Sequence, residues 1–210
     1  MKAKILNLKN PDTYRENIKI AAQALISGRI VAFPTETVYG LGVCADNDRA
    51  IDSLYRVKQR PRDKELSIMI AEPEDVSKHV KHIPPIARRL ISSFWPGPLT
   101  IIFDIPDNRT VGIRNSSHHV VRDLLNTAKI SIVSTSANIS GMPPATDAQQ
   151  VISNFSDKVD VVLDGGQTEA GNPSTVVKIE DNTFKIIRHG VIEEERLNRC
   201  LNEDCLSIRS

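Results

Sequence analysis

The sequence predicts an α/β fold, with one domain built on a twisted, mixed sheet of parallel and antiparallel strands and with helices packed against it. Helical and strand-like segments alternate along most of the 210 residues. Some strands are separated by a helix, which permits parallel pairing, whereas others follow each other too closely for a crossover and must pair antiparallel. No Pro-, Gly- or Ser-rich linker and no internal repeat divides the chain.

The helices are recognised by apolar residues three and four positions apart and by their end signals. The first begins at the capping residue Asp12 and ends at Gly28. The same criteria predict helices over residues 12–28, 47–59, 84–94, 118–128, 146–155 and 193–201.

The strands are recognised by short apolar or alternating runs between turn residues. The first stops at Pro34, which cannot continue a sheet ladder. The last two are close enough to form a hairpin. Strands are expected over residues 29–33, 66–71, 99–105, 110–114, 130–138, 159–166, 174–181 and 184–190.

The composition narrows the class of protein. The net charge is only +1, so any affinity for a polyanion must come from local clustering of charge. The three cysteines are an odd number in a chain too large to need disulfides, which favours a reducing compartment. The N-terminus has no apolar run typical of a signal peptide, and no apolar span reaches about 18 residues. We therefore expect a soluble, cytoplasmic protein without membrane contact.

Several common catalytic motifs are missing from the sequence. It contains no P-loop and no G-x-G-x-x-G at the start of a helix. It has no C-x-x-C or H-E-x-x-H spacing, so we expect no metal bound by protein side chains. A serine hydrolase is disfavoured because the G-x-S-x-G turn is absent.

Lys58 is the first candidate site residue. It follows Ile51, Leu54 and Tyr55 on one stripe of the predicted helix, so its ammonium continues the buried face. A buried ammonium needs an anion or another acceptor as its partner. We therefore favour a functional role for Lys58.

More cations follow this lysine in the stretch "KQRPRDK". Pro61 ends the helix, and an extended chain beyond it would place Arg60, Arg62 and Lys64 on one face. Several cations on one face suit a triphosphate. The alternative is a solvated run of charge, and that is the better interpretation of Arg56.

Two further segments carry small polar side chains next to buried strands. In "STSAN", Ser134, Ser136 and Asn138 alternate at the carboxyl end of a strand, where ligands of α/β sheets commonly bind. A turn that satisfies its own backbone is an equal alternative. In "FPTETVYGLG", Thr35 and Thr37 share one side of the chain and precede a glycine pair. This segment is either a pocket wall or an ordinary strand-to-helix loop.

Taken together, the motifs "FPTETVYGLG", "KQRPRDK", "WPGPLT", "STSAN", "DGG", "PSTVV" and "IIRHG" occur in an order that closely resembles the YrdC-like family of threonylcarbamoyl-AMP synthases. The resemblance covers about residues 15–192. It implies a catalytic domain over residues 1–195, a concave basic groove, and a C-terminal helix and tail over residues 196–210. The chain resembles the single-domain members, without the added C-terminal domain of longer ones.

The resemblance also implies a reaction and partners. L-threonine, bicarbonate or CO₂, and ATP would give threonylcarbamoyl-AMP and pyrophosphate, with Mg²⁺ accompanying ATP. A transferase complex would then move the threonylcarbamoyl group to adenosine 37 of tRNA. Some family members bind double-stranded RNA.

Matching positions imply the site residues. Lys58 and Arg60 are the expected catalytic cations, and Lys64 is expected on the same wall. Met69 stands where many relatives have a histidine or another residue, so the resemblance does not imply a hydrogen bond to threonine from that side. The expected threonine-binding residues are Thr35, Arg114, Ser134 and Ser174. The expected ATP-binding residues are Lys58, Arg60, Arg62, Thr110, Ser136, Asn138, Pro144 and Arg188.

Two alternatives from other classes remain open. One is a non-catalytic module that binds double-stranded RNA or tRNA, although 4% aromatic residues offer few stacking platforms for bases. The other is an adenylating or carbamoylating relative that acts on a different acceptor.

Overall fold

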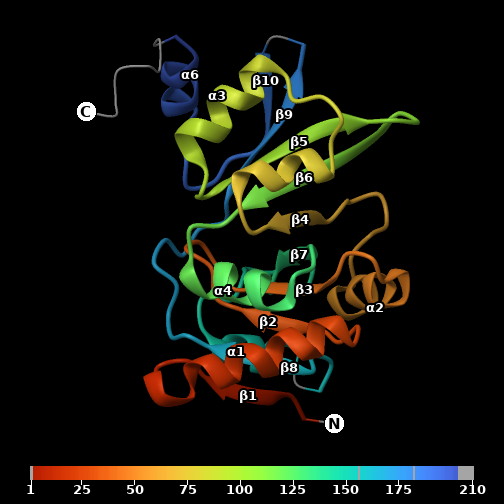
Figure 1. Cartoon of the computed structure of the whole chain (residues 1–210), viewed down its shortest axis with the longest axis vertical. Coiled ribbons are helices and arrows are strands. Elements are labelled where there is room, and N and C mark those ends of the chain that lie inside the picture. The colour runs from red at the N-terminus through yellow and green to blue at the C-terminus, as the bar shows by residue number, and fades with distance from the viewer. Residues whose placement is uncertain (1, 156, 182, 203–210) are drawn as a thin grey trace.

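A single mixed sheet forms the centre of the protein. The computed structural model describes residues 2–155, 157–181 and 183–202. Within these ranges, ten strands pair in the order β1-β8-β2-β3-β7-β4-β6-β5-β9-β10 (Figure 1). Four neighbouring pairs are parallel and five are antiparallel, which confirms the predicted mixed sheet. The strands are β1 (Lys4–Asn7), β2 (Val31–Phe33), β3 (Gly40–Cys44), β4 (Ser67–Ile70), β5 (Leu99–Ile105), β6 (Arg109–Asn115), β7 (Ile132–Ser136), β8 (Val161–Asp164), β9 (Thr175–Glu180) and β10 (Thr183–Arg188).

Helices cover both faces of this sheet. Figure 1 shows α1 and α4 in front of the strands at the N-terminal end, and α3 next to α6 at the other end. Because side chains alternate along a strand, Val31 and Phe33 pack with α1 and α4, whereas Ala32 packs with α2 and α5. The helices are α1 (Pro11–Ile26), α2 (Asp48–Lys58), the 3₁₀ helix η1 (Pro73–Lys78), α3 (Pro85–Phe94), α4 (His119–Ala128), α5 (Ala148–Phe155) and α6 (Glu194–Asn202).

Two strands were not predicted. The edge strand β1 is short, and only one of its four residues is buried, so its pattern is weak. Strand β3 contains Gly40 and Gly42, and its sequence does not have the pattern of a strand. A Cβ atom at Gly42 would lie 2.8 Å from the ring of Phe33 and 2.5 Å from Ile132. The glycines therefore make room for neighbouring side chains within the sheet.

The C-terminal helix belongs to the core of the fold. Leu197 and Cys200 of α6 pack in the same apolar cluster as Leu90 of α3. The predicted boundary between residues 195 and 196 falls within this helix. Residues 203–210 of the predicted tail, including Cys205, lie outside the described residues.

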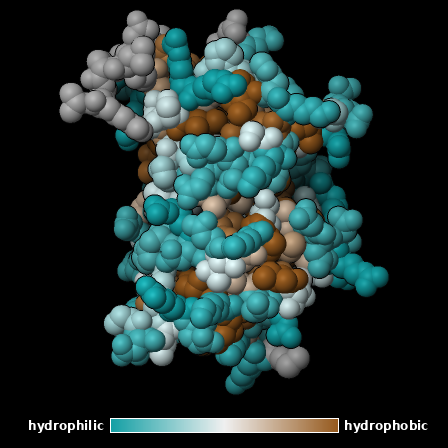
Figure 2. Space-filling model, viewed as in Figure 1, coloured by the Kyte–Doolittle hydropathy of each residue, from teal (hydrophilic) through white to brown (hydrophobic). Residues whose placement is uncertain are grey.

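The visible face of the molecule is mostly hydrophilic, with apolar residues showing between polar ones (Figure 2). None of the helices in the described ranges has both the length and the apolar character that a membrane span requires.

Candidate active site

A cavity of about 680 Å³ opens over the middle strands of the sheet. Strands β4, β5, β6 and β7 supply its floor, and the segments 35–40, 60–67 and 173–176 border it. The lining contains four cationic side chains, Arg60, Lys64, Arg114 and Arg188, and two carboxylates, Asp63 and Glu65. The predicted concavity is present, and the predicted basic character of the groove stays a prediction.

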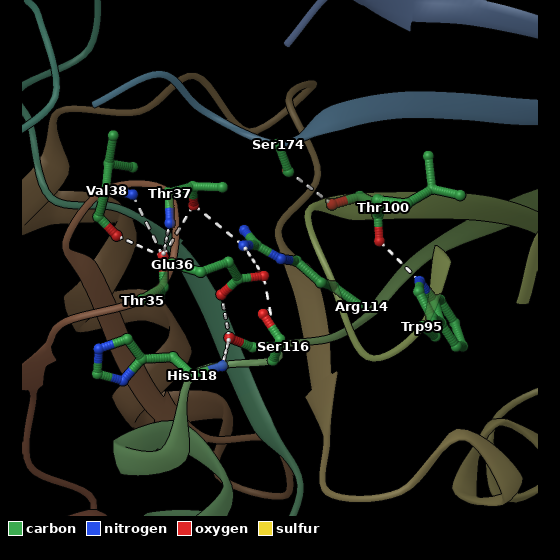
Figure 3. A network of polar contacts seen from close by, with 12 residues as sticks. Thr35, Glu36, Thr37, Val38, Trp95, Thr100, Arg114, Ser116, His118 and Ser174 are labelled. Atoms are coloured by element: carbon green, nitrogen blue, oxygen red, sulfur yellow. Dashed lines mark hydrogen bonds and ion pairs between the residues drawn. The ribbon is translucent and has the colours of Figure 1, made fainter. Parts of the chain in front are cut away.

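The loop after β2 contributes a hydroxyl network to this cavity. The buried Thr35 Oγ1 accepts hydrogen bonds from the backbone amides of Thr37 (3.1 Å) and Val38 (3.3 Å), and donates to the Val38 carbonyl at 2.7 Å. Its distance to Thr37 Oγ1 is 2.8 Å. These contacts fold the loop back on itself, so both threonine side chains are held in place at the cavity wall (Figure 3).

Arg114 is the buried cation of the cavity. It stands on β6 and is 6% exposed. Its Nη2 donates to Thr37 Oγ1 at 3.0 Å and forms an ion pair with Glu36 Oε1 at 2.9 Å. Burial alone would raise the pKa of Glu36, but Arg114 and a hydrogen bond from Ser116 hold that pKa below its usual value. Glu36 is therefore ionised at neutral pH.

The opposite side of the cavity is built around Ser174. Its Oγ lies 3.0 Å from Thr100 Oγ1 on β5. Arg188 of β10 donates through Nη2 to Ser174 Oγ at 3.0 Å and to the Ser174 carbonyl at 2.7 Å. These contacts join β5, the start of β9 and β10, so the predicted threonine-binding Ser174 lies beside the predicted ATP-binding Arg188.

Lys58 is buried, as its helical position predicted, and 2% of it is exposed. Its Nζ donates to the Ser136 carbonyl at 2.6 Å, and to the Asn138 carbonyl and Oδ1, both at 2.9 Å. These acceptors belong to the "STSAN" segment, and Lys58 does not line the cavity. Burial, followed by the charges of Arg60 and Arg188, lowers the pKa of Lys58 to about 7. Lys58 thus joins the end of α2 to the end of β7.

The segment after Pro61 is a turn, so the extended conformation expected there is wrong. The Lys64 amide donates to the Pro61 carbonyl at 3.2 Å. Arg60 and Lys64 still line the cavity. Arg62 instead forms an ion pair with Asp52 at 2.7 Å, and its guanidinium lies over the ring of Tyr55 at 4.5 Å. The turn rotates Arg62 away from its neighbours because residues two apart share a face only in an extended chain.

The remaining predicted residues divide into two groups. Ser134 and Ser136 line the cavity, as does Thr110, whose hydroxyl donates to Glu65 Oε2 at 2.6 Å. Asn138 and Pro144 lie outside the lining. Asn138 turns back, and its Oδ1 accepts from Ser136 Oγ at 2.6 Å. The roles of all these residues toward a ligand stay predictions.

A comparison with known proteins now identifies the family. Residues 23–190 match the Sua5/YciO/YrdC family, which carries the description telomere recombination. The chain belongs to the Sua5/YciO/YrdC family. Two similar proteins and one solved structure illustrate the relationship.

A putative threonylcarbamoyl-AMP synthase of Methanocaldococcus jannaschii is 32% identical over 209 residues, which cover 95% of this chain and 99% of that protein. The threonylcarbamoyl-AMP synthase of Pyrococcus abyssi is 36% identical over 197 residues, which cover 89% of this chain. This chain spans 57% of that protein. A structure of P. abyssi Sua5 complexed with L-threonine has a TM-score of 0.87 and 33% identity, over 95% of this chain and 61% of the other.

The site also contains residues that were not predicted from the sequence. Ser67, Thr100 and Gly112 line the cavity, and Glu36 lies behind it. Thr35 and Thr37 share one side of the chain, and the same alternation puts Glu36 on the other side. The sequence does show a carboxylate between two threonines that share one side of the chain. It does not show what that carboxylate pairs with, because its partner Arg114 is 78 residues away in sequence.

Proposed function

We propose that this chain forms threonylcarbamoyl-AMP and pyrophosphate from L-threonine, bicarbonate or CO₂, and ATP. The observation that carries the proposal is a cavity that combines a buried arginine with buried hydroxyls, in a fold shared with P. abyssi Sua5, whose structure was determined with L-threonine. The names of the relatives in P. abyssi and M. jannaschii support the same activity.

The amino-acid end of the site would lie at Arg114, Thr35, Ser134 and Ser174. The Nε atom of Arg114 is buried and has no hydrogen-bond partner within the described ranges. A buried unpaired donor next to a cavity favours an anionic acceptor from a ligand. The carboxylate of threonine supplies such an acceptor, and the surrounding hydroxyls can both donate and accept toward its polar groups.

The nucleotide end would lie at Arg60, Lys64, Thr110, Ser136 and Arg188, which line the same cavity. The threonine amine first attacks CO₂, loses a proton and becomes a carbamate. A carbamate oxygen then attacks the α-phosphorus of ATP, and the bond to the β,γ-diphosphate breaks, so that pyrophosphate leaves. Fixed cations stabilise the charge that develops on the phosphate oxygens.

The remaining elements of the proposal follow from this chemistry. Mg²⁺ would accompany ATP and offset the charge of its phosphates. Two carboxylates, Asp63 and Glu65, belong to the described cavity lining, and the ion would be held mainly by phosphate oxygens and water. The product would pass to a transferase complex that acts on tRNA. A cytoplasmic location is proposed from the cysteine usage.

The test is pyrophosphate release by the purified protein with ATP and Mg²⁺. We expect release to require both L-threonine and bicarbonate, and mass spectrometry of the reaction to detect threonylcarbamoyl-adenylate. A panel of other amino acids is the matched control. Stimulation by a different amino acid would favour a related activity on another acceptor. Salt-sensitive binding of double-stranded RNA without pyrophosphate release would favour a binding module.

A further inference from the structure

Glu36 and Arg114 form a largely buried ion pair at the wall of the cavity. Their closest atoms are 2.9 Å apart, and their side chains are 11% and 7% exposed. Arg114 lines the cavity, whereas Glu36 does not. Glu36 is therefore placed to act on a bound ligand through Arg114 and through its charge, and not as part of the cavity lining.

Glu36 is itself held from the side away from the cavity. The Ser116 hydroxyl donates to Glu36 Oε2, and the Ser117 amide donates to Oε1 at 3.4 Å. Ser116 follows β6, and the next helix, α4, begins at His119. Figure 3 shows the carboxylate between Arg114 and Ser116, beneath the threonine loop. The carboxylate thus links the loop after β2 to the end of β6.

The hydrogen bonds described for Arg114 involve only Nη2 and leave other donors of its guanidinium for a ligand. Nη2 is occupied by Glu36 and Thr37, whereas Nε is buried and has no partner within the described ranges. An anionic ligand that reaches Nε would share one guanidinium with the carboxylate of Glu36. Two carboxylates on one cation repel each other across it, and the repulsion is strong where water is scarce.

We propose that Glu36 is a positioning residue that holds Arg114 toward the cavity and lowers its affinity for the carboxylate of the amino-acid substrate. The inference rests on the proposed function, because it takes threonine as the ligand of Arg114. Before the substrate binds, Glu36 supplies the counter-charge that a buried guanidinium requires. After binding, it weakens the hold on the substrate carboxylate.

The test compares Glu36→Gln with the wild type by calorimetric titration with L-threonine. Glutamine keeps the size of the side chain and an oxygen acceptor for Arg114, and it removes the charge. We expect the Kd for L-threonine to fall by about tenfold, the effect of removing one nearby like charge. L-threonine amide, which lacks the carboxylate, should bind no more tightly to the variant than to the wild type.

A matched control is Glu195→Gln, the same change at an exposed position of α6 outside the cavity lining. Its Kd for L-threonine should stay within about twofold of the wild-type value. The melting temperature of Glu36→Gln without ligand should fall, and L-threonine should raise it by more than in the wild type.

The outcomes separate the inference from the proposed function. If the wild type does not bind L-threonine, the proposed function fails and the inference fails with it. If the wild type binds and folded Glu36→Gln binds equally or more weakly, only the inference is overturned. If Glu36→Gln does not fold, Glu36→Asp replaces it. The shorter aspartate side chain places the carboxylate farther from Arg114. A Kd for L-threonine about twofold lower than that of the wild type supports the inference, and an unchanged or higher Kd overturns it.

Discussion

Lys58→Met is expected to lower the rate of threonine- and bicarbonate-dependent pyrophosphate release by about 30- to 1000-fold, or about 2–4 kcal/mol of transition-state stabilisation. Methionine has a similar length but donates no hydrogen bond. The carbonyls of Ser136 and Asn138, and the Asn138 Oδ1, would lose the donor that joins them. Because Ser136 lines the cavity, a shift of this strand end would disturb the nucleotide side.

The control for this variant is Lys19→Met on the exposed face of α1, which should retain a wild-type rate. Circular dichroism and thermal melting would establish that Lys58→Met is folded. A folded variant with a near-normal rate would contradict a role for Lys58 in the reaction.

The lowered pKa of Lys58 predicts that the stability of the protein depends on pH. Burial and the nearby Arg60 and Arg188 lower its pKa from 10.5 to about 7 in the folded protein. Between these values the unfolded chain binds a proton that the folded protein has released, so stability rises with pH. The free energy of unfolding of the wild type minus that of Lys58→Met should therefore increase with pH above about pH 7. The increase should be up to about 1.4 kcal/mol per pH unit. Denaturant unfolding across this range measures the difference, and a constant difference would contradict the prediction.

Arg114→Lys is expected to raise the KM for L-threonine by about 10- to 100-fold while leaving the KM for ATP within about threefold. Lysine keeps the positive charge, so Glu36 retains a counter-ion. It lacks the Nε donor and cannot hold Thr37 and Glu36 in the same geometry. Steady-state kinetics with each substrate varied in turn provide the measurement.

Arg122→Lys, at an exposed position of α4, is the matched control for the same chemical change. Its two KM values should equal those of the wild type. If Arg114→Lys raised the KM for ATP more than that for L-threonine, the assignment of Arg114 to the amino-acid carboxylate would be wrong.

Much of the fold could be predicted because its signals are local. Apolar periodicity located helices such as α2 and α4, and short apolar runs located strands such as β5. The omissions were elements whose sequences lack a typical pattern. Strand β3 carries two glycines, which have low strand propensity and are tolerated there because the side chains of Phe33 and Ile132 fill the space.

The candidate site was predicted less completely, since its contacts join distant parts of the chain. Helical periodicity correctly placed Lys58 in the interior, but it could not show that the ammonium faces the end of β7. Arg62 was expected beside Arg60, and the turn after Pro61 directs it to Asp52 instead. The role of Glu36 could not be predicted because its partner, Arg114, comes from a strand far along the chain.

The sequence by itself determined the fold class, the mixed sheet, the burial of Lys58 and the family resemblance. These properties depend on periodicity and on motif order, which are readable along one chain. The tertiary structure decided which polar groups meet. It paired Lys58 with Ser136 and Asn138, turned Arg62 outward, and placed Glu36 behind Arg114. The physical reason is that a buried charge is stabilised by whichever acceptor packing brings within hydrogen-bond distance, and packing depends on the whole chain.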